Sequence, residues 1–328
     1  MSGDGSRAAA QRLFCLRMAD TPAFLDADRP DVPDLVVPRG ILPFHLPGRP
    51  VRGRLVRLGP LADALLARHD NPEVVTRLQG KALALAAGLA GALKFRGSFS
   101  LQVKGDGPVP LLLADCTEAG ALRGYARVSA EREGELHDAM TDAELVGEGY
   151  LAFTVDQGAD GDRHQGIVAI GGDTLAAMAL GYFRQSEQMD AWIRLAAART
   201  GAGAEAGWRA AALVLERVAA GDDDSWRTAT TLAETLTEAE LLDDALAPET
   251  LLWRLFGAEG VAADRARALA YGCRCSRQRL STILAGFDAD DLDHMTIDGT
   301  IVMTCEFCSY SFRFPRHEVR GREESEKA

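Results

Sequence analysis

Apolar and polar residues alternate from Val51 to Leu58, a period that predicts a β-strand with basic side chains on one face. Between residues 61 and 93 the apolar positions change to helical spacing, and Asn71-Pro72 interrupts them. We therefore expect two helices in this segment. The second is rich in Ala, Gly and Leu on nearly every side, which is typical of a helix buried in a core.

The two-residue period returns after these helices. Residues 95–103 and 109–113 flank the turn sequence Gly105-Asp106-Gly107-Pro108, which predicts a β-hairpin. The turn lacks the third glycine, the Lys-Ser/Thr pair and the following helix of a phosphate-binding loop. We therefore expect no nucleotide site here.

Residues 43–220 should form an α/β or α+β core, because strands and helices are mixed along them. Beyond the hairpin, strands are predicted at 124–128, 150–155 and 166–170, and a helix capped by Asp173 runs through Phe183. Residues 1–42 are rich in Asp, Ala and Pro, and prolines at this spacing suit neither helix nor sheet. We expect residues 1–42 to be a loose arm.

Residues 221–258 are interpreted as an acidic helical linker. Nine acidic residues and one basic residue, Arg227, lie between positions 221 and 250. Thr237 with Glu240 forms a capping-box pattern, and threonines together with crowded carboxylates weaken the helices. One face carries four leucines: Leu232, Leu236, Leu241 and Leu242. Such helices need a neighbour to pack on, although an ordinary inter-domain helix remains the alternative.

Composition limits the class of partner. The chain has 328 residues, 47% of them hydrophobic, and is long enough for at least two domains. Its net charge of −12 and pI near 5.0 argue against sequence-independent nucleic-acid binding, which depends on cations. The apolar run 82–93 is shorter than the ~20 residues that cross a bilayer, and charged residues interrupt any N-terminal secretory signal. We expect a cytoplasmic protein without a membrane partner.

Four of the six cysteines lie in two close pairs near the C-terminus. The pairs are Cys273-Arg274-Cys275 and, 29 residues later, Cys305-Glu306-Phe307-Cys308. Two close pairs of thiolates are the ligand set of a tetrahedral zinc site, with Zn–S distances of ~2.3 Å. The sequence therefore predicts a small four-cysteine zinc domain at residues 259–315, which holds one zinc ion, and a charged tail at residues 316–328.

The surroundings of the second pair indicate a zinc knuckle. Strand-like residues 300–304 and 310–314 flank Cys305-x-x-Cys308, so the pair should lie at a hairpin tip, whereas a thioredoxin-type pair begins a helix. His294 and His317 are close enough in sequence to be considered as ligands. We expect both at the surface, because four thiolates already complete the coordination sphere. Cys15 and Cys116 are isolated, and no role is assigned to them.

The spacing alone is typical of a structural zinc site. Two features favour a redox role: the unusual Cys-x-Cys pair, and the arginines Arg274, Arg277 and Arg279 around it, which favour thiolate and hence oxidation by peroxide. Both readings remain open at this point.

A resemblance to a known family distinguishes them. Cys-x-Cys-Ser-Arg at 273–277 and Cys-x-x-Cys at 305–308 resemble the C-terminal zinc centre of the heat shock protein 33 family. The resemblance runs from about residue 43 to residue 315. Further segments resemble the family in order: Val51-Arg52-Gly53, Lys94-Phe95, Gln102 to Pro108, Arg123-Gly124, Tyr182 to Gln188, Arg199-Thr200-Gly201 and Leu252-Trp253-Arg254-Leu255.

The resemblance implies a redox-regulated, ATP-independent holdase chaperone, not an enzyme. The reduced, zinc-bound form would be a largely inactive monomer. Oxidation would pair Cys273 with Cys275 and Cys305 with Cys308, release zinc and destabilise the zinc domain and the linker. The active form would be a homodimer that binds unfolding client proteins.

The sequence departs from the family in two places. Ser309 stands where a knuckle often has Gly for a positive φ, so a different local geometry is expected there, and the proline-rich arm is additional. Two other functions remain as alternatives: a zinc-ribbon nucleic-acid-binding factor and a thiol-disulfide oxidoreductase. Residues 259–328 contain ten basic and twelve acidic residues, which disfavours the first.

Overall fold

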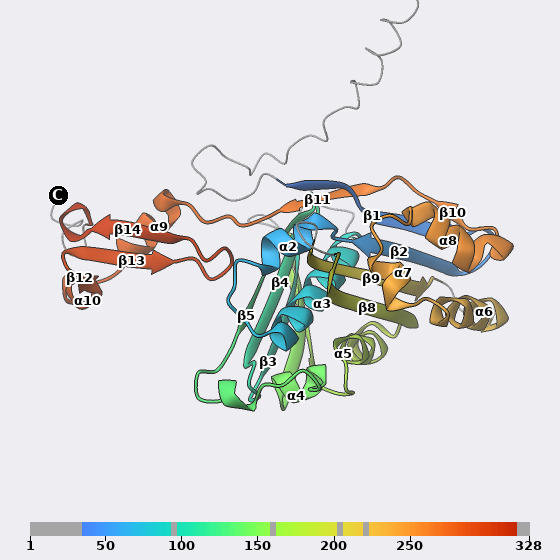
Figure 1. Ribbon diagram of the computed structural model, residues 1–328, viewed down its shortest axis with the longest axis horizontal. Helices are drawn as coiled ribbons and strands as arrows, with labels where there is room; N and C mark the ends of the chain where they lie inside the picture. Colours follow the sequence, from blue (N-terminus) through green and yellow to red (C-terminus); the bar gives the residue numbers. More distant parts are fainter. Residues whose placement is uncertain (1–34, 93–96, 158–161, 202–205, 219–222, 320–328) are drawn as a thin grey trace, which may run out of the picture.

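The computed structural model describes residues 35–92, 97–157, 162–201, 206–218 and 223–319. These residues build one large sheet with helices on both faces, and a smaller C-terminal unit that projects from one end of it (Figure 1). The strands of the large sheet are β1 (Val36–Leu46), β2 (Val51–Arg57), β3 (Ser98–Gly105), β4 (Leu111–Thr117), β5 (Ala121–Arg127), β6 (Gly149–Asp156), β7 (Arg163–Ala169), β8 (Ala191–Thr200), β9 (Gly207–Arg217), β10 (Ala262–Ala263) and β11 (Arg267–Tyr271).

The strand order is β7-β6-β3-β4-β5-β11-β1-β2-β9-β8, with β10 beside β1. Nearly all pairs are antiparallel, and β11 with β5 is parallel. The sheet curves strongly, so that β3, β4 and β5 run steeply in Figure 1 while β2, β8 and β9 run across them.

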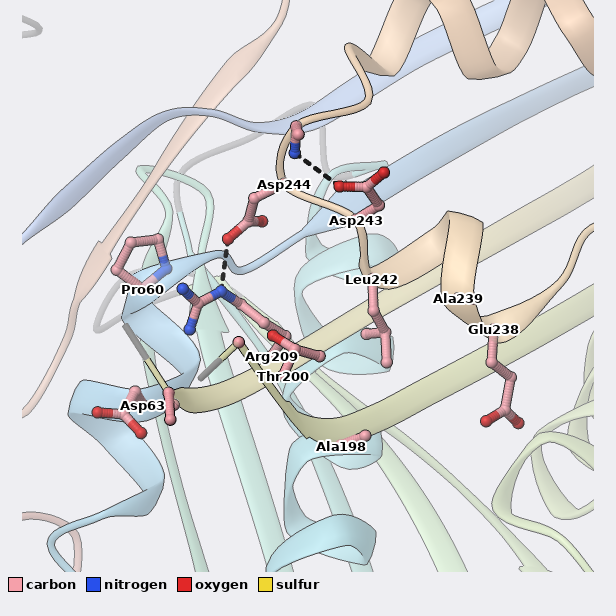
Figure 2. Close-up of a pocket in the computed structure, with 14 residues that line it drawn as sticks. Pro60, Asp63, Ala198, Thr200, Arg209, Glu238, Ala239, Leu242, Asp243 and Asp244 are labelled. Atoms are coloured by element: carbon pink, nitrogen blue, oxygen red, sulfur yellow. Dashed lines mark hydrogen bonds and ion pairs between the residues drawn. The ribbon is translucent and has the colours of Figure 1, made fainter. Parts of the chain in front are cut away.

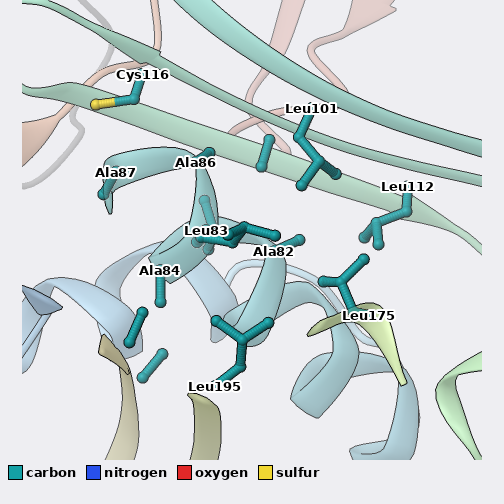
Figure 3. Close-up of a cluster of buried hydrophobic side chains, with 14 of the residues drawn as sticks. Ala82, Leu83, Ala84, Ala86, Ala87, Leu101, Leu112, Cys116, Leu175 and Leu195 are labelled. Carbon is teal, nitrogen blue, oxygen red and sulfur yellow. The ribbon is translucent and has the colours of Figure 1, made fainter. Parts of the chain in front are cut away.

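One face of the sheet packs against α2 (Pro60–Leu66), α3 (Glu73–Ala90) and α5 (Leu175–Tyr182). The break predicted at Asn71-Pro72 is confirmed, because α2 ends before it and α3 begins directly after Pro72. Helix α3 is buried on nearly all sides, as its composition predicts, and meets leucines of β3 and β4 (Figure 3). Small residues permit this close packing, since a Cβ on Gly80 would lie 2.8 Å from that of Ala197.

The β3–β4 hairpin and strands β5, β6 and β7 confirm the predicted strands. The turn of the β3–β4 hairpin packs against the end of α4 (Asp142–Val146), and a Cβ on Gly107 would lie 2.5 Å from the carbonyl oxygen of Leu145. A turn packed this closely has no room for a phosphate. Short helical turns η1 (Glu133–Glu135) and η2 (Phe183–Glu187) follow β5 and α5. The cap predicted for α5 is wrong by one residue, because Thr174 and not Asp173 accepts the bond from the helix amide.

Residues 36–42 correct the predicted arm. They belong to β1, although β1 contains Pro38 and Pro43. Pro38 lies at an irregularity in the β1–β11 pairing between Val37 and Ile41, where no regular ladder bond is needed. The carbonyl of Pro43 accepts from the amide of Asp264, in the connection between β10 and β11. Residues 1–34 of the predicted arm lie outside the described residues.

The acidic linker covers the other face of the sheet at β1, β2, β8 and β9. Its helices are α6 (Asp223–Glu234), α7 (Glu238–Leu242) and α8 (Pro248–Phe256), and the turn η4 (Gly257–Glu259) follows. The capping box of Thr237 and Glu240 is confirmed. Three of the four predicted leucines, Leu236, Leu241 and Leu242, are buried against the sheet, and Leu232 is partly buried there. The linker helices thus pack on a neighbour, as their weak helical propensity requires.

The C-terminal unit has its own small core. It contains α9 (Arg277–Leu284), α10 (Ala289–His294), η5 (Arg316–Glu318) and a sheet of β12 (Thr296–Ile297), β13 (Thr300–Thr304) and β14 (Ser311–Pro315). Its predicted limits change at both ends. Strands β10 and β11 pair within the large sheet, so the unit begins after Tyr271 rather than at 259. Val319 is buried in the core of the unit, although the sequence predicts it in the tail.

Among the described helices, none combines the length and the hydropathy that a bilayer-spanning segment needs.

Candidate metal centre

Two connections of the C-terminal unit carry the four paired cysteines. Cys273 lies just after β11, and Cys275 precedes Ser276, whose side chain caps α9 by accepting from the amide of Arg279. Cys305 and Cys308 lie at the tip between β13 and β14, so the predicted hairpin is confirmed. No helix begins at this pair.

Ser309 adopts the positive φ that a knuckle requires. Its φ is 54°, and its amide donates to the carbonyl of Cys305 at 2.7 Å. The amide of Cys305 in turn donates to the carbonyl of Tyr310 at 2.9 Å. The expected change of geometry is therefore absent, and Ser309 accepts a conformation that costs an L-residue about 1 kcal/mol.

The four sulfur atoms lie within 4.8 Å of one another. The Sγ–Sγ distances are 3.4 Å between Cys273 and Cys275, 3.6 Å between Cys273 and Cys305, and 3.4 Å between Cys275 and Cys308. These distances exceed the ~2.05 Å of a disulfide bond. Tetrahedral zinc with Zn–S of ~2.3 Å places its sulfurs about 3.8 Å apart, so the donor set and spacing fit this ion.

The thiols strongly perturb one another. The hydrogen bond between Cys273 and Cys275 lowers the pKa of Cys273 to about 7, and the bond with Cys273 also lowers the pKa of Cys305. The same contacts raise the pKa of Cys275 and of Cys308, because each loses stabilising bonds if it ionises. The contacts thus favour ionisation of Cys273 and Cys305 over that of Cys275 and Cys308, and a bound dication would favour the thiolate form of all four.

The arginines act differently from the sequence-based hypothesis. Arg274 pairs with Asp115 at 3.7 Å, and Arg277 donates to the carbonyl of Arg313 and lies 4.6 Å over the ring of Phe314. The largest causes of the thiol pKa shifts are the neighbouring thiols. Arg274 and Arg277 thus anchor the cysteine loops to their surroundings.

The knuckle rests on the core through contacts that the sequence did not predict. Arg123 of β5 lies 4.2 Å over the ring of Phe307, and Tyr125 meets the same ring at 6.4 Å between centroids. Arg68 donates to the carbonyl of Cys308 at 3.4 Å, and Ser309 Oγ lies 3.4 Å from His69 Nδ1. A long-range docking of this kind leaves no local sequence pattern.

Asp115 of β4 joins both cysteine loops to the core. Its carboxylate binds Arg123 at 2.6 Å and Arg274 at 3.7 Å. Arg274 stands between Cys273 and Cys275, and Arg123 holds the phenyl ring between Cys305 and Cys308. One buried carboxylate therefore positions both halves of the thiol cluster.

The remaining candidates lie elsewhere. Cys116 is fully buried in the main core, where desolvation raises the pKa of its thiol to about 12 (Figure 3). His294 and His317 are exposed and outside the four-thiol group. Cys15 lies outside the described residues.

Fold and site together define a protein with an α/β core, a helical cover and a four-thiol centre able to hold a metal ion. The family model described as Hsp33 protein matches residues 40–315, and the chain belongs to this family. The 33 kDa chaperonin of Caulobacter vibrioides is 41% identical over 279 residues, covering 82% of this chain and 92% of the relative. The 33 kDa chaperonin of Azotobacter vinelandii is 37% identical, covering 82% and 89%.

A solved structure has the same fold. The crystal structure of the 33 kDa chaperonin (heat shock protein 33 homologue) from Thermotoga maritima matches with a TM-score of 0.72 and 20% identity. The match covers 86% of this chain and 96% of the other. At this identity the comparison supports the fold alone.

Proposed function

We propose that this chain is a redox-regulated, ATP-independent holdase chaperone. The observation that carries the proposal is the four-thiol cluster, whose sulfurs lie within 4.8 Å of one another directly after a strand of the main sheet. Membership of the Hsp33 family and the name chaperonin of its relatives support a client-binding role in the cytoplasm. The protein acts on clients by binding and not by catalysis.

Cys273, Cys275, Cys305 and Cys308 are the proposed ligands of one zinc ion in the reduced form. Zinc, when bound, supplies folding free energy to a unit whose buried core consists of six side chains in the described residues. The protein sets the spacing of the four sulfurs. Ser276 fixes the start of α9 after Cys275, and the amide of Ser309 closes the knuckle by donating to the carbonyl of Cys305.

Oxidation removes the ligands in pairs. We propose disulfides Cys273–Cys275 and Cys305–Cys308, each formed when two thiolates give up two electrons to one hydrogen peroxide. The O–O bond breaks, two protons are taken up and two waters leave. Sulfurs that start 3.4 Å apart, as in Cys273 and Cys275, need little movement to bond. Without its ligands the metal is released, and the C-terminal unit loses its main support.

The linker is the proposed responding element. Its helices cover apolar strands of the sheet and hold their shape by that contact. Released helices leave apolar surface that binds unfolding proteins, and two such surfaces join in the oxidised homodimer.

The alternatives lack a supporting observation in the described structure. The Cys305–Cys308 pair lies between two strands, unlike a thioredoxin-type pair, which begins a helix. The net charge of −12 disfavours a zinc-ribbon factor that binds nucleic acid.

Light scattering of a thermally unfolding client tests the proposal. The reduced, zinc-loaded protein should leave aggregation unchanged, whereas peroxide treatment should release one zinc and suppress aggregation. A Cys116→Ala variant is the matched control, because it removes a buried thiol outside the cluster. Retained zinc with unchanged aggregation after peroxide would refute the proposal.

A further inference from the structure

Four arginines of the core sheet pair with acidic residues of the cover. Arg39 pairs with Glu249 of α8, and Arg49 with Glu259 of η4. Arg209 binds Asp244 and Arg217 binds Asp223, each at 2.5 Å. Figure 2 shows Arg209 reaching Asp244 across a pocket between β9 and the linker. We call Arg39, Arg49, Arg209 and Arg217 the arginine rim.

The rim stands at the two ends of an apolar face. Arg217 is paired in register with Val51, beside the turn that carries Arg49, while Arg209 and Arg39 lie toward the opposite ends of their strands. Most side chains between them are apolar and buried under the linker: Leu42, Phe44, Leu46, Val51, Leu55, Ala196, Ala211, Leu213 and Leu215. Arg194, opposite Leu213 in register, and Arg57 at the end of β2 also lie on this face. Arg209 and Arg217 are eight positions apart on one strand, which is about 26 Å at the rise of an extended chain.

The linker therefore meets this face with apolar side chains in the middle and carboxylates at both ends. Its own composition is matched to the rim, with nine acidic residues and one basic residue between positions 221 and 250. Arginine suits this task, because its planar guanidinium binds carboxylates in a fixed, often bidentate geometry. When the linker leaves, the apolar face is uncovered and the four arginines of the rim lose their linker partners. Arg57 loses the linker carbonyls to which it donates, whereas Arg217 keeps its ion pair with Asp190.

We propose that this uncovered face binds client segments in which about eight extended apolar and small polar residues are flanked by carboxylates. The arginine rim selects the flanking charge, and the tethered linker occupies the same face in the reduced protein. The inference rests on the proposed holdase function and adds to it the chemistry of the client. Charge at both ends sets the preference, whereas the apolar centre provides most of the affinity.

Three synthetic peptides test the rim directly. All carry the same eight-residue centre of alternating Leu and Ser, and they are flanked at each end by two Asp, two Asn or two Lys residues. Fluorescence anisotropy measures their binding to the full-length chain after peroxide treatment. The Asp peptide should bind roughly tenfold more tightly than the Asn peptide, since several partly exposed ion pairs each contribute modestly. The Lys peptide should bind weakest.

Two further measurements isolate the arginines. Raising the salt to about 1 M should remove most of the difference between the Asp and Asn peptides in the unaltered chain. The double variant Arg49→Gln/Arg217→Gln neutralises one end of the rim. It should reduce the difference between the Asp and Asn peptides at low salt from roughly tenfold to roughly threefold and leave binding of the Asn peptide unchanged. Arg132→Gln is the matched control, because Arg132 is an exposed arginine that pairs with Glu135 away from this face. The salt experiment needs no variant and so does not depend on how the variants fold.

Equal affinity for the Asp and Asn peptides would overturn the inference, as would an equal loss in the Arg132→Gln control. If the oxidised protein suppresses client aggregation but binds none of the peptides, the inference fails and the holdase function stands. If it neither binds the peptides nor suppresses aggregation, both fail.

Discussion

Arg57, the last residue of β2, holds the end of linker helix α7 on the sheet. It is 7% exposed, and its three guanidinium nitrogens donate to the carbonyls of Glu240, Leu241 and Leu246. These include carbonyls at the C-terminus of α7, which have no partner inside the helix. Arg57→Met keeps an apolar side chain of similar reach and removes all three bonds.

The magnitude follows from the number of bonds. A hydrogen bond from a charged donor contributes about 1.5–3 kcal/mol, but carbonyls freed with the linker regain water. Taking about 1 kcal/mol for each bond gives about 3 kcal/mol of lost docking free energy. This change raises the population of released linker roughly a hundredfold.

Hydrogen exchange by mass spectrometry measures that population in the reduced, zinc-loaded protein. Amides of α6, α7 and α8 should exchange roughly a hundredfold faster in Arg57→Met, while those of β3 keep their rates. Arg52→Met is the matched control: it lies on the same strand, pairs with Glu216 and points to the other side of the sheet. Unchanged linker exchange in Arg57→Met, or the same acceleration in Arg52→Met, would refute the role of Arg57 as an anchor.

Three further predictions concern the thiol centre. Cys275→Ser removes a proposed ligand and should weaken zinc binding more than ~100-fold in a chelator competition. Amide hydrogen exchange in the linker helices should also become faster under reducing conditions. Unchanged zinc affinity would exclude Cys275 as a ligand. Asp115→Asn loses the charge that holds Arg123 and Arg274, so zinc release by peroxide, followed with a colorimetric chelator, should be roughly tenfold faster. Glu135→Gln, which alters an exposed pair, should have no such effect. Ser309→Gly relieves a positive φ and should strengthen zinc binding about fivefold; weaker binding would show that the contact of its hydroxyl with His69 dominates.

The four-thiol cluster and several local elements are predicted from the sequence, because their signals are local. Pairs of cysteines two and three residues apart define the thiol centre, Asn71-Pro72 ends one helix before the next, and Thr237 with Glu240 marks the start of α7. Each depends on residues that are neighbours along the chain. The positive φ of Ser309 shows the limit of such reasoning, since hydrogen bonds of the knuckle impose a conformation that serine rarely adopts.

Elements that depend on distant partners are not predicted. Strands β8 and β9 contain the alanine runs Leu195 to Ala198 and Ala210 to Ala212, and alanine favours helices. Strand pairing overrides that propensity, since β9 lies between β2 and β8, and β8 pairs with β9 along its length at the edge of the sheet. Strand β1 contains two prolines. Pro38 is tolerated because it lies at an irregular pairing with β11, and Pro43 because it faces the connection between β10 and β11. The partners of Asp115 are likewise set by the fold, because Arg274 lies far from it in sequence.

The positions of the centre and the linker explain how one can act on the other. In Figure 1 the C-terminal unit that carries the thiols and helices α6 and α8 lie at opposite ends of the described molecule. The chain between them is β10 and β11, and β11 lies between β1 and β5 in the sheet. It is held by two register pairs with β5 and by an irregular pairing with β1. Because Cys273 follows β11 by two residues, we expect loss of order at the thiols to loosen the end of a short strand whose other end leads into the linker. The sheet itself would then provide the route from the thiols to the linker.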